Sequence, residues 1–169
     1  TSSASPGAVI SEFKQPDGSP DYFSNQTDVL YSYEQDVENL IKSGREWYQP
    51  VSQLTGVTVN PGFSNLIPGE KIQIRLRVVA RSPVNTQFRL YEGETLQKSV
   101  QVQLVNLYAY TGAQAQITDS ITKITPVSSF PKYTIKFFNN GESGSKGWLD
   151  FFLLQGRALN AYNGGTYVI

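Results

Sequence analysis

The sequence has 169 residues, enough for one domain with a substantial buried core, and its 14 basic residues balance 14 acidic ones. A formal net charge of zero gives no electrostatic reason to expect nucleic acid or an anionic membrane surface as a partner. Because the chain has no Cys and no His, it cannot itself supply a thiolate nucleophile, a disulfide, a Ser-His-Asp triad or most kinds of zinc site.

The amino-terminal stretch, "TSSASPGAVI", lacks the basic and apolar regions of a signal peptide, and the chain does not begin with Met. We therefore expect a mature protein or a piece of a longer one. No apolar run approaches the roughly 18–20 residues of a membrane-spanning helix. Pro and Gly make "FKQPDGSPD", at 13–21, a predicted loop. "DVENLIKSG", at 36–44, favours one short helix that ends at Gly44.

Most of the remaining chain alternates between apolar and polar residues, which is the period of a half-buried strand. Strands of this kind are predicted at 71–78, 86–91, 96–104, 113–124 and 132–138. Gly93 suits the tight turn of a hairpin between the second and third of them, and the Gly-rich stretch at 139–147 predicts a loop. The pattern predicts an all-β fold, in which residues 1–169 form a single antiparallel, jelly-roll-like β-sandwich domain.

The most apolar segment, at 148–154, contains one charge, Asp150. A strict period of two places Leu149, Phe151 and Leu153 on one face and Trp148, Asp150, Phe152 and Leu154 on the other. A strand that is apolar on both faces is normally covered on both. We therefore expect the sandwich core on one side, and on the other side another part of this chain or a neighbouring domain.

Asp150 needs a partner on such a strand, because an unpaired buried carboxylate is costly. An Arg is the natural choice, since its guanidinium group can hold a carboxylate through two hydrogen bonds. The candidates are Arg45, Arg75, Arg77, Arg81 and Arg157. The alternative is that Asp150 accepts hydrogen bonds from loop amides near Gly147.

Aromatic and basic side chains provide a candidate surface for a ligand or a partner, made up of Trp47, Tyr48, Arg75, Arg77, Trp148 and Phe152. Aromatic residues of this kind can stack on sugars, and arginines can hold an anionic group. The alternative is structural: aromatic residues in a sandwich commonly pack in the core, and charged residues on a strand keep the sheet soluble.

No catalytic residue can be assigned. The carboxylates that glycosidase chemistry would need are present as Asp36/Glu38, Glu92/Glu94 and Asp119, but none of them lies in a distinctive motif. Oxygen-rich stretches at 15–21 and 32–39 make calcium the one candidate metal, although neither has EF-hand spacing. No other metal or cofactor is expected.

Four segments in order resemble one family. They are "YSYEQDVENLIKSGREWYQP", "NLIPGEKIQIRLRVVARS", "FRLYEGETL" and "KGWLDFFLLQGRALNAY". Together they are similar to the N-terminal β-domain of the type IX secretion sortase of Bacteroidetes, a gingipain-type cysteine peptidase. One departure is Gln49-Pro50, where the family pattern has Gly-Glu. Arg45 is the preferred partner of Asp150, since both lie in these segments.

The resemblance implies a non-catalytic domain at the secreted or outer-membrane cell surface, cut from a larger protein whose Cys and His lie in a downstream peptidase domain. It further implies that domain as a partner, together with secreted cargo or a cell-surface glycan. Asp119-Ser120-Ile121 also resembles the acceptor of Bacteroidetes O-glycosylation, which makes Ser120 a candidate modification site. A stand-alone carbohydrate-binding or adhesive module is the alternative function, and a glycan-active enzyme ranks after it.

Overall fold

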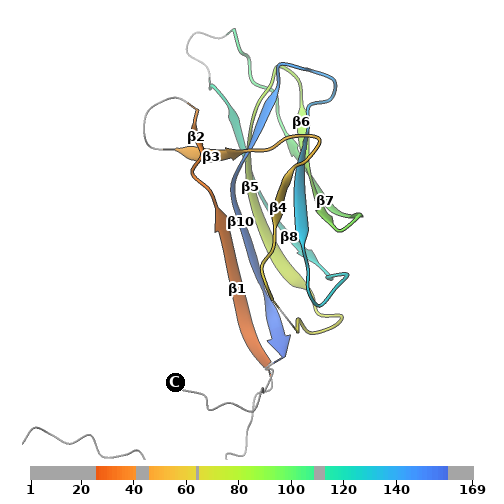
Figure 1. The fold of residues 1–169 in the computed structure, drawn as a ribbon. Coiled ribbons are helices and arrows are strands. Elements are labelled where there is room, and N and C mark those ends of the chain that lie inside the picture. The colour runs from red at the N-terminus through yellow and green to blue at the C-terminus, as the bar shows by residue number, and fades with distance from the viewer. Residues whose placement is uncertain (1–25, 41–45, 64, 109–112, 160–169) are drawn as a thin grey trace, which may run out of the picture.

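A computed structural model of the chain describes residues 26–40, 46–63, 65–108 and 113–159. Every regular element in these ranges is a strand, and all strand pairs are antiparallel. The strands form two sheets that pack face to face (Figure 1). The expected all-β antiparallel sandwich is therefore confirmed. In these ranges no helix is long and apolar enough to cross a membrane.

The first sheet has six strands and is built around the long strand β10 (Lys146–Leu159). On one side β10 pairs with β5 (Ile72–Arg81), which pairs with β8 (Gln116–Ile124). On the other side two strands share its edge: β1 (Gln26–Glu34) and, nearer the start of β10, β3 (Trp47–Pro50). The two-residue strand β2 (Glu38–Asn39) pairs with β3.

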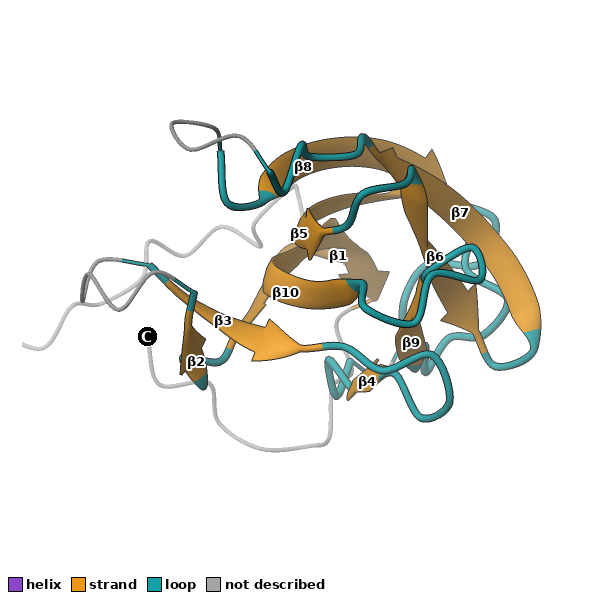
Figure 2. Cartoon of the chain, turned by 90° about the horizontal axis from the view of Figure 1, so that it is seen from above, coloured by secondary structure: helices purple, strands orange, loops and turns teal. Residues whose placement is uncertain are grey.

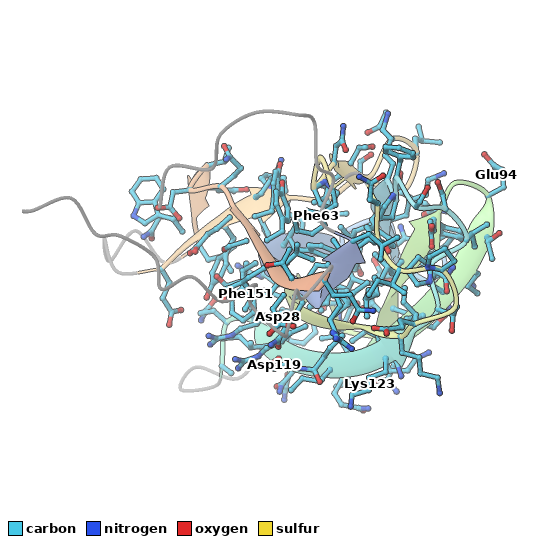
Figure 3. All side chains as sticks on the ribbon, turned by 90° about the horizontal axis from the view of Figure 1, so that it is seen from below. Asp28, Phe63, Glu94, Asp119, Lys123 and Phe151 are labelled. Carbon is cyan, nitrogen blue, oxygen red and sulfur yellow. The ribbon has the colours of Figure 1, made fainter. Side chains whose placement is uncertain are left out.

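The second sheet has four strands in the order β4 (Val57–Val59), β9 (Tyr133–Phe138), β6 (Thr86–Glu92) and β7 (Thr95–Val102). β6 and β7 form the predicted hairpin, in which Gly93 has a φ of 56°. Glu94 lies at its tip (Figure 3). The two sheets meet where β8 lies beside β7 (Figure 2).

The core lies between the sheets and follows from the alternation of the strands. In β5, Ile72, Ile74, Leu76 and Val78 are buried, while Arg75 is exposed. These side chains face Phe88, Leu90, Ile135 and Phe137 of the second sheet in one hydrophobic cluster. The main hydrophobic core therefore lies between the two sheets and contains residues from both of them.

The expected helix at 36–44 is wrong in its described part, because Glu38 and Asn39 pair with Tyr48 and Trp47 in a small β-ladder. The pairing with β3 outweighs the weak helix propensity of this stretch. Residues 41–45, which include Gly44 and Arg45, lie outside the described residues.

Candidate functional site

Asp150 is the extra residue of a β-bulge. Leu149 lies opposite Val78 of β5 and Phe151 lies opposite Arg77, so the register shifts between them and Asp150 has no partner residue on β5. A bulge bends a strand and re-aims the side chains on either side of it. The charge inside the apolar segment therefore marks the point where the pleat of β10 is interrupted.

The bulge changes which residues share a face of β10, and the strict alternation expected from the sequence is wrong here. Leu149, Phe152 and Leu154 all belong to the main core. Trp148 belongs to a second cluster with Tyr48 and Val79. Leu149 and Phe152 are three positions apart, so only an inserted residue lets both point inward.

The Asp150 carboxylate forms an ion pair with Arg77, whose Nε lies 3.2 Å from Oδ2. The Asp150 side chain is 14% exposed and that of Arg77 is 37% exposed. Two other candidate arginines have different partners, since Arg75 pairs with Asp119 and Arg157 with Glu70. Arg45, the preferred partner in the sequence, lies outside the described residues.

A cavity of about 260 Å³ opens beside this ion pair, where β1 and β3 meet along one edge of β10. β1 ends at Glu34, opposite Phe151, and β3 pairs with Leu149, so the bulge lies at the junction. The cavity is lined by Glu34, Asp36, Glu46, Trp47, Tyr48, Arg77 and Asp150. Four carboxylates thus surround one guanidinium group in a chain with no formal net charge.

The surroundings of the cavity perturb two of its groups. Burial raises the pKa of Asp150 and outweighs the opposing effect of Arg77, while the negative charges of Glu34, Glu46 and Asp36 raise it further. Burial also raises the pKa of Tyr48, whose hydroxyl donates a hydrogen bond of 2.8 Å to Glu46. The cavity therefore favours a positively charged group and disfavours a further negatively charged one.

Three members of the candidate partner surface are buried. Phe152 is 0% exposed, Trp148 is 2% exposed and Tyr48 is 3% exposed. The indole Nε1 of Trp148 donates a hydrogen bond of 2.8 Å to Glu38. The expectation that these three residues form an accessible surface is therefore wrong. The bulge turns Phe152 into the core, and residues of β2 and β3 cover Trp148.

Trp47, Arg75 and Arg77 remain accessible to solvent. Trp47, which lines the cavity, is 42% exposed. Arg75 lies on the outer face of the six-stranded sheet. Its Nε donates a hydrogen bond of 3.0 Å to Asp119, and its Cζ lies 5.3 Å from the ring centre of Phe151. This hydrogen bonding holds the pKa of Asp119 below its usual range.

Ser120 lies in the middle of β8, opposite the core residue Leu76, and is partly buried. Two other residues of the strand, Asp119 and Lys123, lie on the solvent side of β8 (Figure 3). Modification of Ser120 stays a prediction.

No three Asp or Glu residues in the described ranges converge in a way that would hold a metal ion. The oxygen-rich stretch at 15–21 lies outside those ranges, and calcium binding stays a prediction. Three of the five carboxylates considered for glycosidase chemistry, Glu38, Glu92 and Asp119, have structural partners. Glu92, 5% exposed, accepts hydrogen bonds from the amides of Val127 and Ser128 at 2.9 and 3.0 Å and anchors the loop before β9.

Sequence reasoning did not find the junction of β1 and β3, because neither strand was predicted. The one sequence signal at this junction is the charge of Asp150 inside an apolar strand, which is the residue that forms the bulge. The clustering of Glu34, Asp36 and Glu46 around it depends on pairings between distant parts of the chain.

The chain matches no model of a protein family and no curated protein. Among solved structures it is similar to dimeric latent PorU from Porphyromonas gingivalis, with a TM-score of 0.62 and 17% sequence identity. The match covers 86% of this chain and 14% of the PorU chain. This likeness shows a common fold for the β-domain, and the chain spans a small part of PorU's length.

Two viral proteins match less well. The coat protein of Tobacco streak virus has a TM-score of 0.32 at 10% identity, covering 85% of this chain and 91% of that one. A protein of infectious bursal disease virus has a TM-score of 0.29 at 16% identity, covering 92% of this chain and 38% of that one. TM-scores this low carry no functional inference.

Proposed function

We propose that this chain is the non-catalytic β-domain of a cell-surface protein of the type IX sortase kind, in which it supports a downstream peptidase domain. The observation that carries the proposal is the fold match to PorU, a type IX sortase, over 86% of this chain. The sequence resemblance points to the same family independently of the fold. The domain is secreted or displayed at the outer-membrane surface in this proposal.

The segments that carry the resemblance fall on the elements that build the sandwich. "KIQIRLRVVARS" contains β5, "FRLYEGETL" spans the β6–β7 turn, and "KGWLDFFLLQ" is the first part of β10 with its bulge. The departure at Gln49-Pro50 falls at the end of β3, beyond the two residues that pair with β2, where Pro is tolerated because no described strand pairs on that side. The resemblance therefore falls on the strands that build the core, and the departure falls outside them.

A supporting role fits the chemistry of the chain better than a catalytic one. With no Cys and no His, the chain has neither member of a cysteine peptidase pair. The match to 14% of PorU's length leaves room for such residues elsewhere in a longer polypeptide. Recognition of secreted cargo is a second role proposed for the domain, with the accessible Trp47 and Arg77 as the contact residues.

The structure does not favour the alternative of a carbohydrate-binding module. Of the four aromatic residues in the candidate surface, Tyr48, Trp148 and Phe152 are buried and Trp47 is exposed. Stacking on one sugar chain requires neighbouring rings on one surface.

The experiment that tests the proposal is identification of the mature protein in its source. Antibodies raised against this chain should capture a polypeptide several times longer, and peptide mapping should place a Cys- and His-containing peptidase domain after residue 169. A mature protein that ends near residue 169, or one that continues into a glycosidase, would overturn the proposal.

A further inference from the structure

β1 is the long open edge of the sandwich in the part of the chain that the structure describes. It pairs without interruption with β10, and along 27–34 no other described strand pairs with it. The other edges are managed differently: β7 and β8 lie beside each other, and β2 and β4 have only two and three residues. An unpaired row of backbone N–H and C=O groups is a template for another strand.

The side chains of β1 protect this edge with negative charge alone. Soluble proteins commonly place charged residues, above all Lys, or Pro or a bulge on an exposed edge strand. β1, with the sequence QTDVLYSYE, has no Lys, Pro or bulge, and its exposed charged residues, Asp28 and Glu34, are both acidic. Leu30 is 72% exposed on the outer side. Val29, Tyr31 and Tyr33 face the core but are only partly buried. An added strand with apolar residues at alternate positions would complete the burial of these three.

The end of β1 supplies charge complementarity. Glu34 is its last residue, and Asp36, Glu46 and Asp150 lie with it around the cavity of about 260 Å³. Arg77 balances one of these four carboxylates. A cavity of this size takes one long side chain, and a Lys or Arg would also meet the exposed ring of Trp47 at the same cavity.

We infer that β1 is the docking edge for an extended segment of a neighbouring domain of the same polypeptide, with a Lys or Arg of that segment in the acidic cavity at the end of β1. The segment adds a strand beside β1, so main-chain hydrogen bonds provide binding and the basic residue fixes the register. This inference rests on the proposed function, because it takes the partner from the longer protein. It names the surface through which the two parts meet.

Amide hydrogen exchange tests the inference, with the intact longer protein compared against the isolated 169-residue chain. The amides of 26–34 should exchange at least about tenfold more slowly in the intact protein, while those of the β7 edge, 95–102, keep the same rates in both. Glu34→Lys in the intact protein should abolish this protection, because it opposes the incoming positive charge. Leu30→Lys should do the same by blocking the edge. Glu94→Lys, at the tip of the β6–β7 hairpin, is the matched control and should leave it unchanged.

The experiment distinguishes failure of this inference from failure of the proposed function. If other surfaces of the domain are protected in the intact protein and 26–34 exchanges equally in both, the inference is overturned and the proposed function stands. If no part of the domain changes, or the mature protein contains no further domain, both are overturned. Thermal melts of the three variants of the isolated chain check that each still folds, since all three positions are on the surface.

Discussion

The Nε of Arg77 lies 3.2 Å from the Asp150 carboxylate because a bulge in β10 places Asp150 between the residues that face Val78 and Arg77. The pair is half-buried and lies among three further carboxylates. Its net effect on stability is therefore set by two opposing terms: the attraction between the two groups, and the cost of removing an anion from water beside other anions.

Removal of Arg77 should destabilise the domain more than removal of Asp150. Arg77→Met leaves Asp150 partly buried and without its positive partner, so we expect a loss of roughly 1–3 kcal/mol in the free energy of unfolding. Arg77→Met combined with Asp150→Asn should recover most of this loss, because the double variant contains no stranded charge. Urea unfolding of the four proteins measures the coupling, and additive effects would contradict it.

Arg75→Met is the control for that cycle. Its partner Asp119 is 35% exposed, compared with 14% for Asp150, so water can solvate the carboxylate that remains. We expect a smaller destabilisation than that caused by Arg77→Met. A larger one would mean that the outer face of the sheet is covered in solution.

The dependence of stability on pH should have opposite signs for Asp150 and Asp119. The pKa of Asp150 is raised, so the folded chain binds its proton first as the pH falls; this group adds stability towards about pH 4, and the gain is lost as the pH rises through the folded pKa. The pKa of Asp119 is lowered, so its contribution is present above about pH 4 and is lost as the pH falls through the folded pKa.

Urea unfolding between about pH 3 and pH 7 separates these two contributions. The stability of the natural chain relative to Asp150→Asn should increase as the pH falls from neutral towards about 4, and relative to Asp119→Asn it should decrease below about 4. A flat difference for Asp150→Asn would show that its carboxylate is solvated in the folded chain.

Two buried tyrosines should respond differently to loss of the hydroxyl group. The Tyr133 hydroxyl is buried and has no hydrogen-bond partner among the described residues, so Tyr133→Phe should be neutral or stabilise the domain by up to about 1 kcal/mol. Tyr48→Phe loses the 2.8 Å bond to Glu46 and should cost about 1–2 kcal/mol. Thermal melts of both variants decide this, and equal shifts would contradict the difference in partners.

Gly147 should not tolerate a side chain. A Cβ at this position would lie 2.4 Å from Cδ2 of Phe137 and 2.8 Å from Cζ of Phe88, inside the core. Gly147→Ala should therefore destabilise the domain by about 1–3 kcal/mol through overpacking. Gly144→Ala, whose Cβ would meet only Glu142 at 3.4 Å, is the matched control and should change stability little. Equal effects would mean that the two phenylalanines move aside.

Strands with one-sided alternation and the apolar run of β10 could be predicted from the sequence, whereas the edge strand β1 and the short strands could not. In β5 four aliphatic residues at every second position point into the core, and β6, β8 and β9 show the same period. The sequence does not predict β1, because the apolar Leu30 interrupts the alternation of Val29, Tyr31 and Tyr33 with polar residues. β2, β3 and β4 are too short for a period to appear.

The candidate site was predictable only in part. The sequence indicated that Asp150 needs an arginine, and Arg77 was one of five considered. The choice among them depends on the register of β10 against β5, which joins residues from 65 positions apart (Lys146 and Arg81) to 82 positions apart (Gln155 and Gln73). The inward position of Phe152 depends on the bulge, and strict alternation gives the opposite face. The acidic cavity further requires that β1 and β3 share one edge of β10.

The central claim, that this domain supports a peptidase domain of the same protein, is tested most directly by separating the two and measuring their association. The remainder of the mature protein, expressed without residues 1–169, should bind the purified chain in isothermal titration calorimetry, and its own thermal midpoint should rise when the chain is added. Glu34→Lys should weaken this binding, while Glu94→Lys should not. No detectable binding at about 100 μM, a concentration that would reveal even a weak complex, together with an unchanged midpoint would contradict the account.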